Sequence, residues 1–138
     1  MAQRIRVGSV ELNQGAMARV VGSIAWKATE RAAETTRLRA QANLRGAGRI
    51  NSGKMLDGIV KVDASSVQLK PTFSVVSTSP ASVFQEHGTS AHGPVRARAL
   101  RFSPKGSSQV VYAKWVRGVT AARFMRRAKD ALQVGDFK

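Results

Sequence analysis

The chain contains 138 residues and no cysteine, which excludes disulfides, catalysis by a thiolate and metal sites built on cysteine. Its 23 Lys and Arg residues against 8 Asp and Glu residues give a net charge of +15, which favours a polyanionic neighbour: nucleic acid or the acidic face of a partner protein. A hydrophobic content of 43% is enough for one core of ordinary size, so we expect a single domain over residues 1–138.

The N-terminal part of the sequence predicts a strand followed by a long helix. Residues 1–12 are interpreted as a strand or arm, because apolar side chains alternate with arginines. The helix is predicted over residues 13–45, with Asn13 as its N-cap and with Gly46 and Gly48 beyond its end. Helical spacing relates Met17, Val20, Val21, Ile24, Ala28, Ala32 and Thr35.

This predicted helix is too long for a compact domain of the chain's size. About 31 residues at about 1.5 Å each give roughly 45 Å, whereas a compact domain of this length is only about 37 Å across. The helix therefore has to span the domain or project from it. Its small side chains, such as Ala25, Ala28 and Ala32, need a surface to lie against, and a second subunit would supply one.

Glycines and alternating side chains predict a connector and then a β-hairpin. Residues 46–58 form the glycine-rich connector. Residues 59–78 form the hairpin, in which Val60 and Val62 share one face of the first strand and Phe73 lies in the second. The alternation of apolar and polar residues predicts that one face of this hairpin is exposed to solvent.

The next segment predicts a short helix, a loop and a second hairpin. The short helix and loop cover residues 79–98, with Ser79 as the cap, Pro80 in the first helical position and Gly88 at the stop. Two short strands over residues 99–117 form the second hairpin.

A C-terminal helix completes the predicted fold. It covers residues 120–132 and is capped by Thr120. We expect Trp26 and Trp115 in the core. The fold class is therefore α+β: a long N-terminal helix packed on an antiparallel sheet of about four to five strands, with a short C-terminal helix.

The stretch "ASVFQEHGTSAHGP" (residues 81–94) has the residue types of an active site but not their spacing. Glu86 and His87 are adjacent, so on a helix their side chains diverge by about 100°. His87 and His92 match no metal-ligand spacing. "GAGRINSGK" fails as a phosphate loop, because Met55 stands where Ser or Thr would coordinate magnesium. We predict no catalytic residue, cofactor or metal; the alternative is a hydrolase that uses His87.

The positive charge is concentrated in the second half of the chain. Between residues 96 and 129 there are ten basic residues and no acidic one. No known DNA-reading motif accompanies them, so contact would be with phosphates in general or with an acidic partner protein. The candidate contact residues are Arg96, Arg98, Arg101, Lys105, Arg117, Arg126 and Arg127. A non-specific DNA-binding protein that uses residues 96–129 is the alternative function.

Three segments in order carry a resemblance to a known family: "NSGKMLDGI" (51–59) after the long helix, "ASVFQEHGTS" (81–90) and "YAKWVRGVTAARFMRRAKDAL" (112–132). Together they resemble the small neck or tail-completion proteins of long-tailed, siphovirus-type bacteriophages, often described as putative minor tail components. That family typically shows a T-G-x-L-x-x-S-I segment, then a Y-A-x-x-x-E-x-G-T segment, and last an R-x-F-φ-x-x-A or P-x-F segment that opens the final helix. The resemblance covers nearly the whole chain, and residues 92–117 resemble a longer variant of it.

The match to these segments is partial. Glu86, Gly88 and Thr89 match the second, and the third matches at Arg123, Phe124 and Ala128. The chain departs from the pattern at Ser52, Gly58, Ser82 and Ala122, which stand for Thr, Ser, Ala and Pro. The position of the protein within the neck therefore stays open: it could be a tail terminator, a tail completion factor or a head-closure stopper.

The resemblance implies a structural virion protein without catalysis. It implies a homo-oligomeric ring, six subunits by expectation, that joins the capsid connector to the tail tube around the DNA channel. Partners would be neighbouring neck and tail-tube proteins, with possible non-specific contact to genomic DNA. No apolar run suits a membrane or a signal peptide, so we expect assembly in the host cytoplasm and a final place in the virion.

Within that expectation, two residue groups receive roles. Glu86, Gly88 and Thr89 would set a turn that orders the following loop at a subunit boundary. Arg123 and Phe124 would anchor the last helix, with the phenylalanine in the core and the arginine directed at a carboxylate, for which Glu86 is the candidate.

Overall fold

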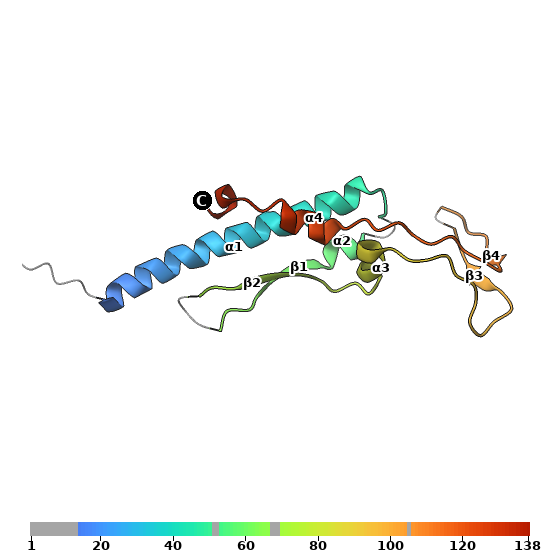
Figure 1. Ribbon diagram of the computed structural model, residues 1–138, viewed down its shortest axis with the longest axis horizontal. Coiled ribbons are helices and arrows are strands. Elements are labelled where there is room, and N and C mark those ends of the chain that lie inside the picture. The colour runs from blue at the N-terminus through green and yellow to red at the C-terminus, as the bar shows by residue number, and fades with distance from the viewer. Residues whose placement is uncertain (1–13, 51–52, 67–69, 105) are drawn as a thin grey trace, which may run out of the picture.

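The computed structural model describes residues 14–50, 53–66, 70–104 and 106–138 (Figure 1). The predicted strand over residues 1–12, the Asn13 cap and Lys105 lie outside the described residues. The order of elements is α1 (Gln14–Gly46), α2 (Lys54–Asp57), β1 (Ile59–Asp63), β2 (Phe73–Ser77), α3 (Ala81–His87), β3 (Leu100–Phe102), β4 (Val111–Ala113), α4 (Phe124–Asp130) and the 3-10 helix η1 (Val134–Phe137). The α+β class is confirmed.

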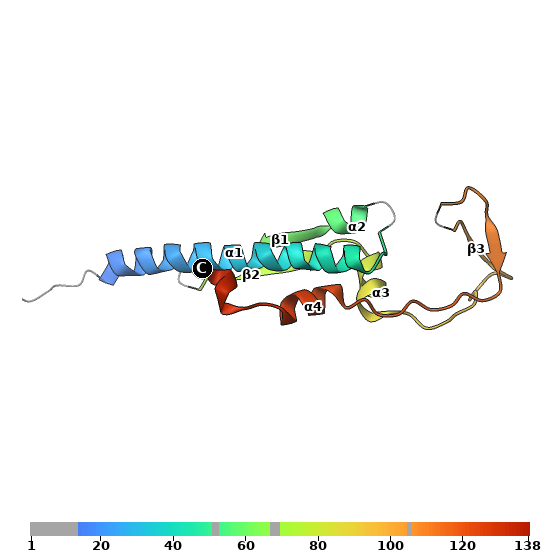
Figure 2. The ribbon, with the colours of Figure 1, turned by 90° about the horizontal axis from the view of Figure 1, so that it is seen from above.

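The long helix α1 is confirmed and forms the axis of the molecule. Its 33 residues give a length of about 50 Å. It ends where Gly48 adopts a φ of 66° and donates its N–H to the Arg45 carbonyl at 2.9 Å. Figures 1 and 2 show the β1–β2 hairpin along one side of α1 and α4 along another, while the N-terminal turns of α1 extend past the hairpin.

The β1–β2 hairpin is antiparallel, and its face toward α1 includes a lysine. Lys61 lies opposite Val75 in the register, and its Nζ binds Glu30 of α1 at 2.9 Å. Phe73 meets Trp26 edge to face, with ring centroids 5.1 Å apart. The prediction of one solvent-exposed face is right, but that face carries Val62, which is 43% exposed.

The core is small and lies at the C-terminal half of α1. Its fully buried members are Ala40, Leu44, Ile59, Phe124 and Ala128, with Met55, Leu56, Val75 and Met125 packed around them. The alanines on α1 and α4 let the two helices approach closely. Met55 and Leu56 belong to α2, a single helical turn within what the sequence predicted as a connector.

The prediction of one sheet with four to five strands is wrong. The described residues form two separate two-stranded sheets, β1–β2 and β3–β4. The chain between α3 and α4 leaves the core as two extended segments and carries β3–β4 to the far end of the molecule from the start of α1 (Figure 1). Trp115 lies on this extension and is 70% exposed, so its predicted burial is also wrong.

The two short helices begin differently from their predicted starts. Pro80 has helical angles, but the Ser79 side chain makes no cap; its carbonyl accepts the Ser82 N–H at 3.0 Å. The last helix begins at Phe124, with Arg123 rather than Thr120 before its first turn. The delay arises because Ala122 donates its N–H to the Gln85 carbonyl at 2.7 Å, which holds the preceding residues extended.

The C-terminal residues return to α1. The Arg39 guanidinium donates to both carboxylate oxygens of Asp136, at 2.6 and 2.9 Å, and Arg31 donates to the carbonyl of Lys138. Gln133 and Asp136 form a reciprocal capping box that starts η1. Among the helices described, none is long and apolar enough to cross a membrane.

Candidate functional site

Glu86 caps α4 from the end of α3. Its two carboxylate oxygens accept the backbone N–H groups of Met125 at 2.9 Å and Arg126 at 3.0 Å. The first N–H groups of a helix have no partner within the helix, and the positive end of the helix dipole favours an anion there. The carboxylate therefore fixes where α4 begins and ties α3 to it.

Gly88 and Thr89 extend this connection between α3 and α4, which we call the joint. Gly88 has a φ of 76°, and a Cβ at this position would lie 2.5 Å from the Val119 carbonyl oxygen. Thr89 donates its N–H to that carbonyl at 2.8 Å, and its Oγ1 accepts the Val119 N–H at 3.0 Å. A glycine is needed here both for the left-handed backbone and for the close approach of residues 118–121.

The chain segments that contain Thr89 and Val119 stay paired further from the core. A Cβ on Gly118 would lie 1.9 Å from the Thr89 carbonyl oxygen, so only glycine fits. His92 and Val116 then exchange backbone hydrogen bonds at 3.0 and 3.1 Å. These contacts form the base of a narrow two-stranded projection, residues 89–119, which we call the basic arm.

The structure brings together all five residues predicted at the turn. Glu86, Gly88 and Thr89 hold the backbone on either side of Arg123, while Phe124 is fully buried in the core, as predicted. The suggested pairing of Glu86 with Arg123 is not seen, because the carboxylate binds backbone N–H groups instead. Arg123 is exposed and has a φ of 51°, a left-handed conformation that is strained for a side chain with a Cβ.

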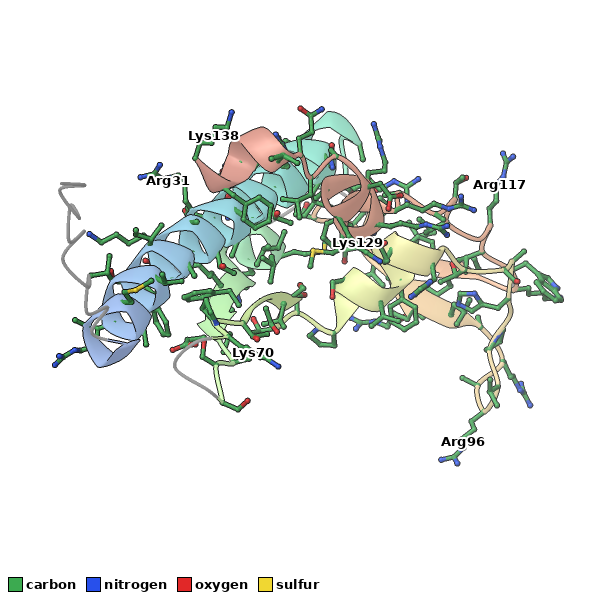
Figure 3. The ribbon with its side chains drawn as sticks, turned by 60° about the vertical axis from the view of Figure 1, so that its left-hand side comes forward. Arg31, Lys70, Arg96, Arg117, Lys129 and Lys138 are labelled. Carbon is green, nitrogen blue, oxygen red and sulfur yellow. The ribbon has the colours of Figure 1, made fainter. Side chains whose placement is uncertain are left out.

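The predicted basic contact residues do not form one surface. Arg96, Arg98, Arg101 and Arg117 are exposed on the basic arm, whereas Arg126 and Arg127 are exposed on α4. Figure 3 shows Arg96 and Arg117 directed away from each other on the basic arm, with Lys129 on α4 well apart from both. The arm is thus positive around its circumference, and α4 carries a second group of cations.

Aromatic side chains accompany the cations on the basic arm. Tyr112 is 66% exposed and Trp115 is 70% exposed. Tyr112 lies opposite Arg101 in the β3–β4 register, which places the two side chains on one face. Guanidinium groups beside aromatic rings can bind phosphate while the ring stacks on a base or packs on an apolar partner.

A stripe of apolar side chains on α1 is uncovered. Met17, Val20, Val21 and Ile24 recur at helical spacing on the turns that extend past the hairpin, and they are 48–63% exposed. Helical spacing in the sequence relates these four residues, whereas the sequence predicts a partner surface for the small side chains of the same helix, such as Ala25 and Ala28. The structure adds that the stripe lies outside the core formed by Ala40 and Leu44.

Two arginine contacts were missed from the sequence. Arg49 donates to the Gln85 side chain at 3.1 Å and to the Thr120 carbonyl, which ties the connector to the joint. Arg39 binds Asp136, and its hydrogen bonds, with one from the Gln133 N–H, hold the pKa of Asp136 below its usual value. Both contacts join residues more than 30 positions apart, so no local pattern indicates them.

The histidines and carboxylates of the described part of the chain form no metal-binding cluster. No group of three or more His, Asp or Glu side chains there could hold a metal ion. His87 is exposed at the end of α3, and the Nδ1 of His92 lies 3.2 Å from the Ser90 carbonyl oxygen.

Comparison of the chain with protein-family models, with curated proteins and with solved structures finds no match.

Proposed function

We propose that this chain is a structural protein of the bacteriophage head–tail junction, a neck, tail-completion or tail-terminator protein. It assembles as a ring that joins the capsid connector to the tail tube around the DNA channel. The proposal combines the resemblance of three segments, 51–59, 81–90 and 112–132, with the distribution of buried and exposed side chains in the single chain.

The observation that carries the proposal is that the described residues expose apolar side chains at two opposite ends of the molecule (Figure 1). The start of α1 exposes the stripe around Val20, and the basic arm at the other end exposes Tyr112 and Trp115. A monomer rarely leaves such apolar projections in water, because burying them against another surface is favourable. A ring of identical subunits gives each projection a neighbouring subunit.

The charge fits the same assembly. The cations of the basic arm, among them Arg96, Arg98 and Arg101, have no acidic residue within the arm. In a ring around a DNA channel they would face the genome's phosphates or the acidic surface of the next ring along the particle axis.

Labelling of intact particles tests the proposal. The protein carries a C-terminal epitope tag, and electron microscopy locates the label on virions purified from lysed host cells. We expect label only where the tail joins the capsid. Label along the tube, at the tail tip or over the capsid shell, or particles that contain no tagged chain, would contradict the proposed location.

A non-specific DNA-binding protein is the second candidate. The pairing of exposed arginines with exposed Tyr112 and Trp115 on the basic arm favours it, because this combination suits phosphate contact and base stacking. It requires no ring and no virion. Duplex binding by the isolated protein in the absence of any particle location would favour this candidate over the first.

A further inference from the structure

A second apolar surface lies beside the core. A groove of about 670 Å³ runs between α1, β2, α4 and η1. Small side chains of α1 form its floor, namely Thr29, Ala32, Ala33 and Thr36. Its walls are largely apolar and come from Phe73, Val75, Met125, Leu132 and Phe137, while Glu86, His87, Arg126, Lys129 and Asp130 lie at its rim.

We propose that this groove receives the exposed α1 stripe of a second copy of the chain. The stripe consists of Met17, Val20, Val21 and Ile24. Both surfaces are apolar, and both extend over eight residues of helix, from residue 17 to 24 and from residue 29 to 36, which is seven steps along the axis. Each is therefore about 10 Å long. Ala32 and Ala33 of the floor are already buried, so the incoming side chains would lie against the exposed walls at Leu132 and Phe137, each 39% exposed.

The two surfaces cannot meet within one chain. Both belong to the continuous helix α1, so their separation along the axis is fixed. At 3.6 residues per turn, the middle of the stripe also lies about a third of a turn from the middle of the groove. A stripe that fits a groove elsewhere on the same rigid element produces head-to-tail association, which closes as a ring or continues as a filament.

Charge does not oppose this contact. Between residues 15 and 26 of α1 the only charged side chain is Arg19, and the groove rim offers Asp130 and Glu86 as well as basic groups. The inference rests on the proposed ring and specifies its interface: the overhanging turns of one subunit lie along the middle of α1 in the next.

The test uses two variants, one for each half of the contact. Val20→Glu places a carboxylate in the stripe, and Thr29→Arg fills the groove floor without touching the core. Val62→Glu is the matched control, since Val62 is also an exposed valine and lies on the face of the β1–β2 hairpin directed away from α1 and the groove. Circular dichroism and thermal melts establish that each variant folds, and Leu132→Glu on the opposite groove wall replaces Thr29→Arg if that variant does not.

Analytical ultracentrifugation over a range of protein concentrations measures assembly. We expect Val20→Glu and Thr29→Arg each to weaken self-association at least about tenfold, because each puts a charge into an apolar contact. We expect Val62→Glu to leave self-association unchanged. An equimolar mixture of the two variants should form a 1:1 dimer, because the first retains an intact groove and the second an intact stripe.

Three outcomes would overturn the inference. The first is a wild-type protein that stays monomeric at its highest soluble concentration. This outcome would include the case in which residues 1–13 of the same chain occupy the groove. The second is wild-type assembly by both groove variants, Thr29→Arg and Leu132→Glu. That result would indicate that the stripes of two copies pair with each other instead. A mixture without the 1:1 dimer would exclude the head-to-tail geometry. Particle labelling is independent of these results, so the failure of this interface and of the proposed location can be told apart.

Discussion

The carboxylate of Glu86 binds the backbone N–H of Met125 at 2.9 Å, so a residue at the end of one short helix sets the first turn of another. It binds the next N–H, that of Arg126, at 3.0 Å. Through this contact α3 and α4 act as one unit at the base of the basic arm. Residues 81–94, which have the residue types of an active site, therefore contain the joint between α3 and α4.

The first prediction concerns the cap itself. Glu86→Ala should lower the free energy of unfolding by about 1–2 kcal/mol, the usual range for a lost helix cap, because two N–H groups of α4 lose their acceptor. Glu86→Gln should cost less, since the amide oxygen still accepts one bond. Urea unfolding followed by circular dichroism measures both, and equal losses for the two variants would contradict the capping geometry.

The same joint predicts that Glu86 and Arg123 are energetically independent. Because Glu86 contacts the backbone and no ion pair with Arg123 is present among the described residues, Glu86→Gln and Arg123→Gln should add to within about 0.5 kcal/mol in a double-mutant cycle. A larger coupling energy would show that the side chains interact in solution.

The second prediction concerns the left-handed backbone at Arg123, where φ is 51°. Arg123→Gly should raise the free energy of unfolding by up to about 1 kcal/mol, because glycine adopts this conformation without steric cost. Arg126→Gly, inside α4, is the control and should be destabilising by about 1 kcal/mol. Thermal melts of the two variants should therefore move in opposite directions.

The third prediction concerns the base of the basic arm. Gly118→Ala would place a Cβ 1.9 Å from the Thr89 carbonyl oxygen, and the clash is with backbone rather than a flexible side chain. The two segments must separate, so protease cleavage within residues 89–119 should accelerate. Gly46→Ala is the control, because a Cβ there meets nothing within 4 Å. Equal cleavage rates for the two variants would mean that the segments are not paired in solution.

The fourth prediction is a pH dependence of the C-terminal contact. Arg39 holds the pKa of Asp136 below its usual value, so the contact contributes stability above the unfolded pKa of about 4. That contribution is lost as the pH falls through the lower folded pKa, because the protonated carboxyl no longer attracts Arg39. The protection factors of the backbone N–H groups of residues 133–138, which compare each exchange rate with that of an unfolded chain at the same pH, should fall on acidification in the wild type. In Asp136→Asn these protection factors should be low already at pH 7 and change little with pH.

The fifth prediction separates DNA contact from contact with an acidic protein. If the basic arm binds phosphate, replacing Arg96, Arg98 and Arg101 with Gln should reduce the slope of log affinity against log salt by about 3. The control replaces Arg19, Lys27 and Lys54, which are equally charged and exposed outside the arm. Fluorescence anisotropy with a labelled duplex measures both. Equal effects would assign binding to net charge alone, and no binding at low salt would leave the acidic partner.

The sequence by itself determined the elements that depend on local pattern. Helical spacing and the glycines at 46 and 48 were enough to place α1, and alternation was enough for both hairpins. Such features depend on residues within a few positions of one another, so the local sequence is sufficient to predict them.

Tertiary structure alone decided what these elements contact. The sequence could not show that β3–β4 forms a separate sheet on an extended arm, because its residues alternate as they would in the centre of a larger sheet. It could not show that Glu86 caps α4 or that Arg39 holds Asp136, since these partners are 39 and 97 positions apart. Long-range contacts depend on how the rigid helix α1 orders the rest of the chain around it, and no spacing along the chain encodes that arrangement.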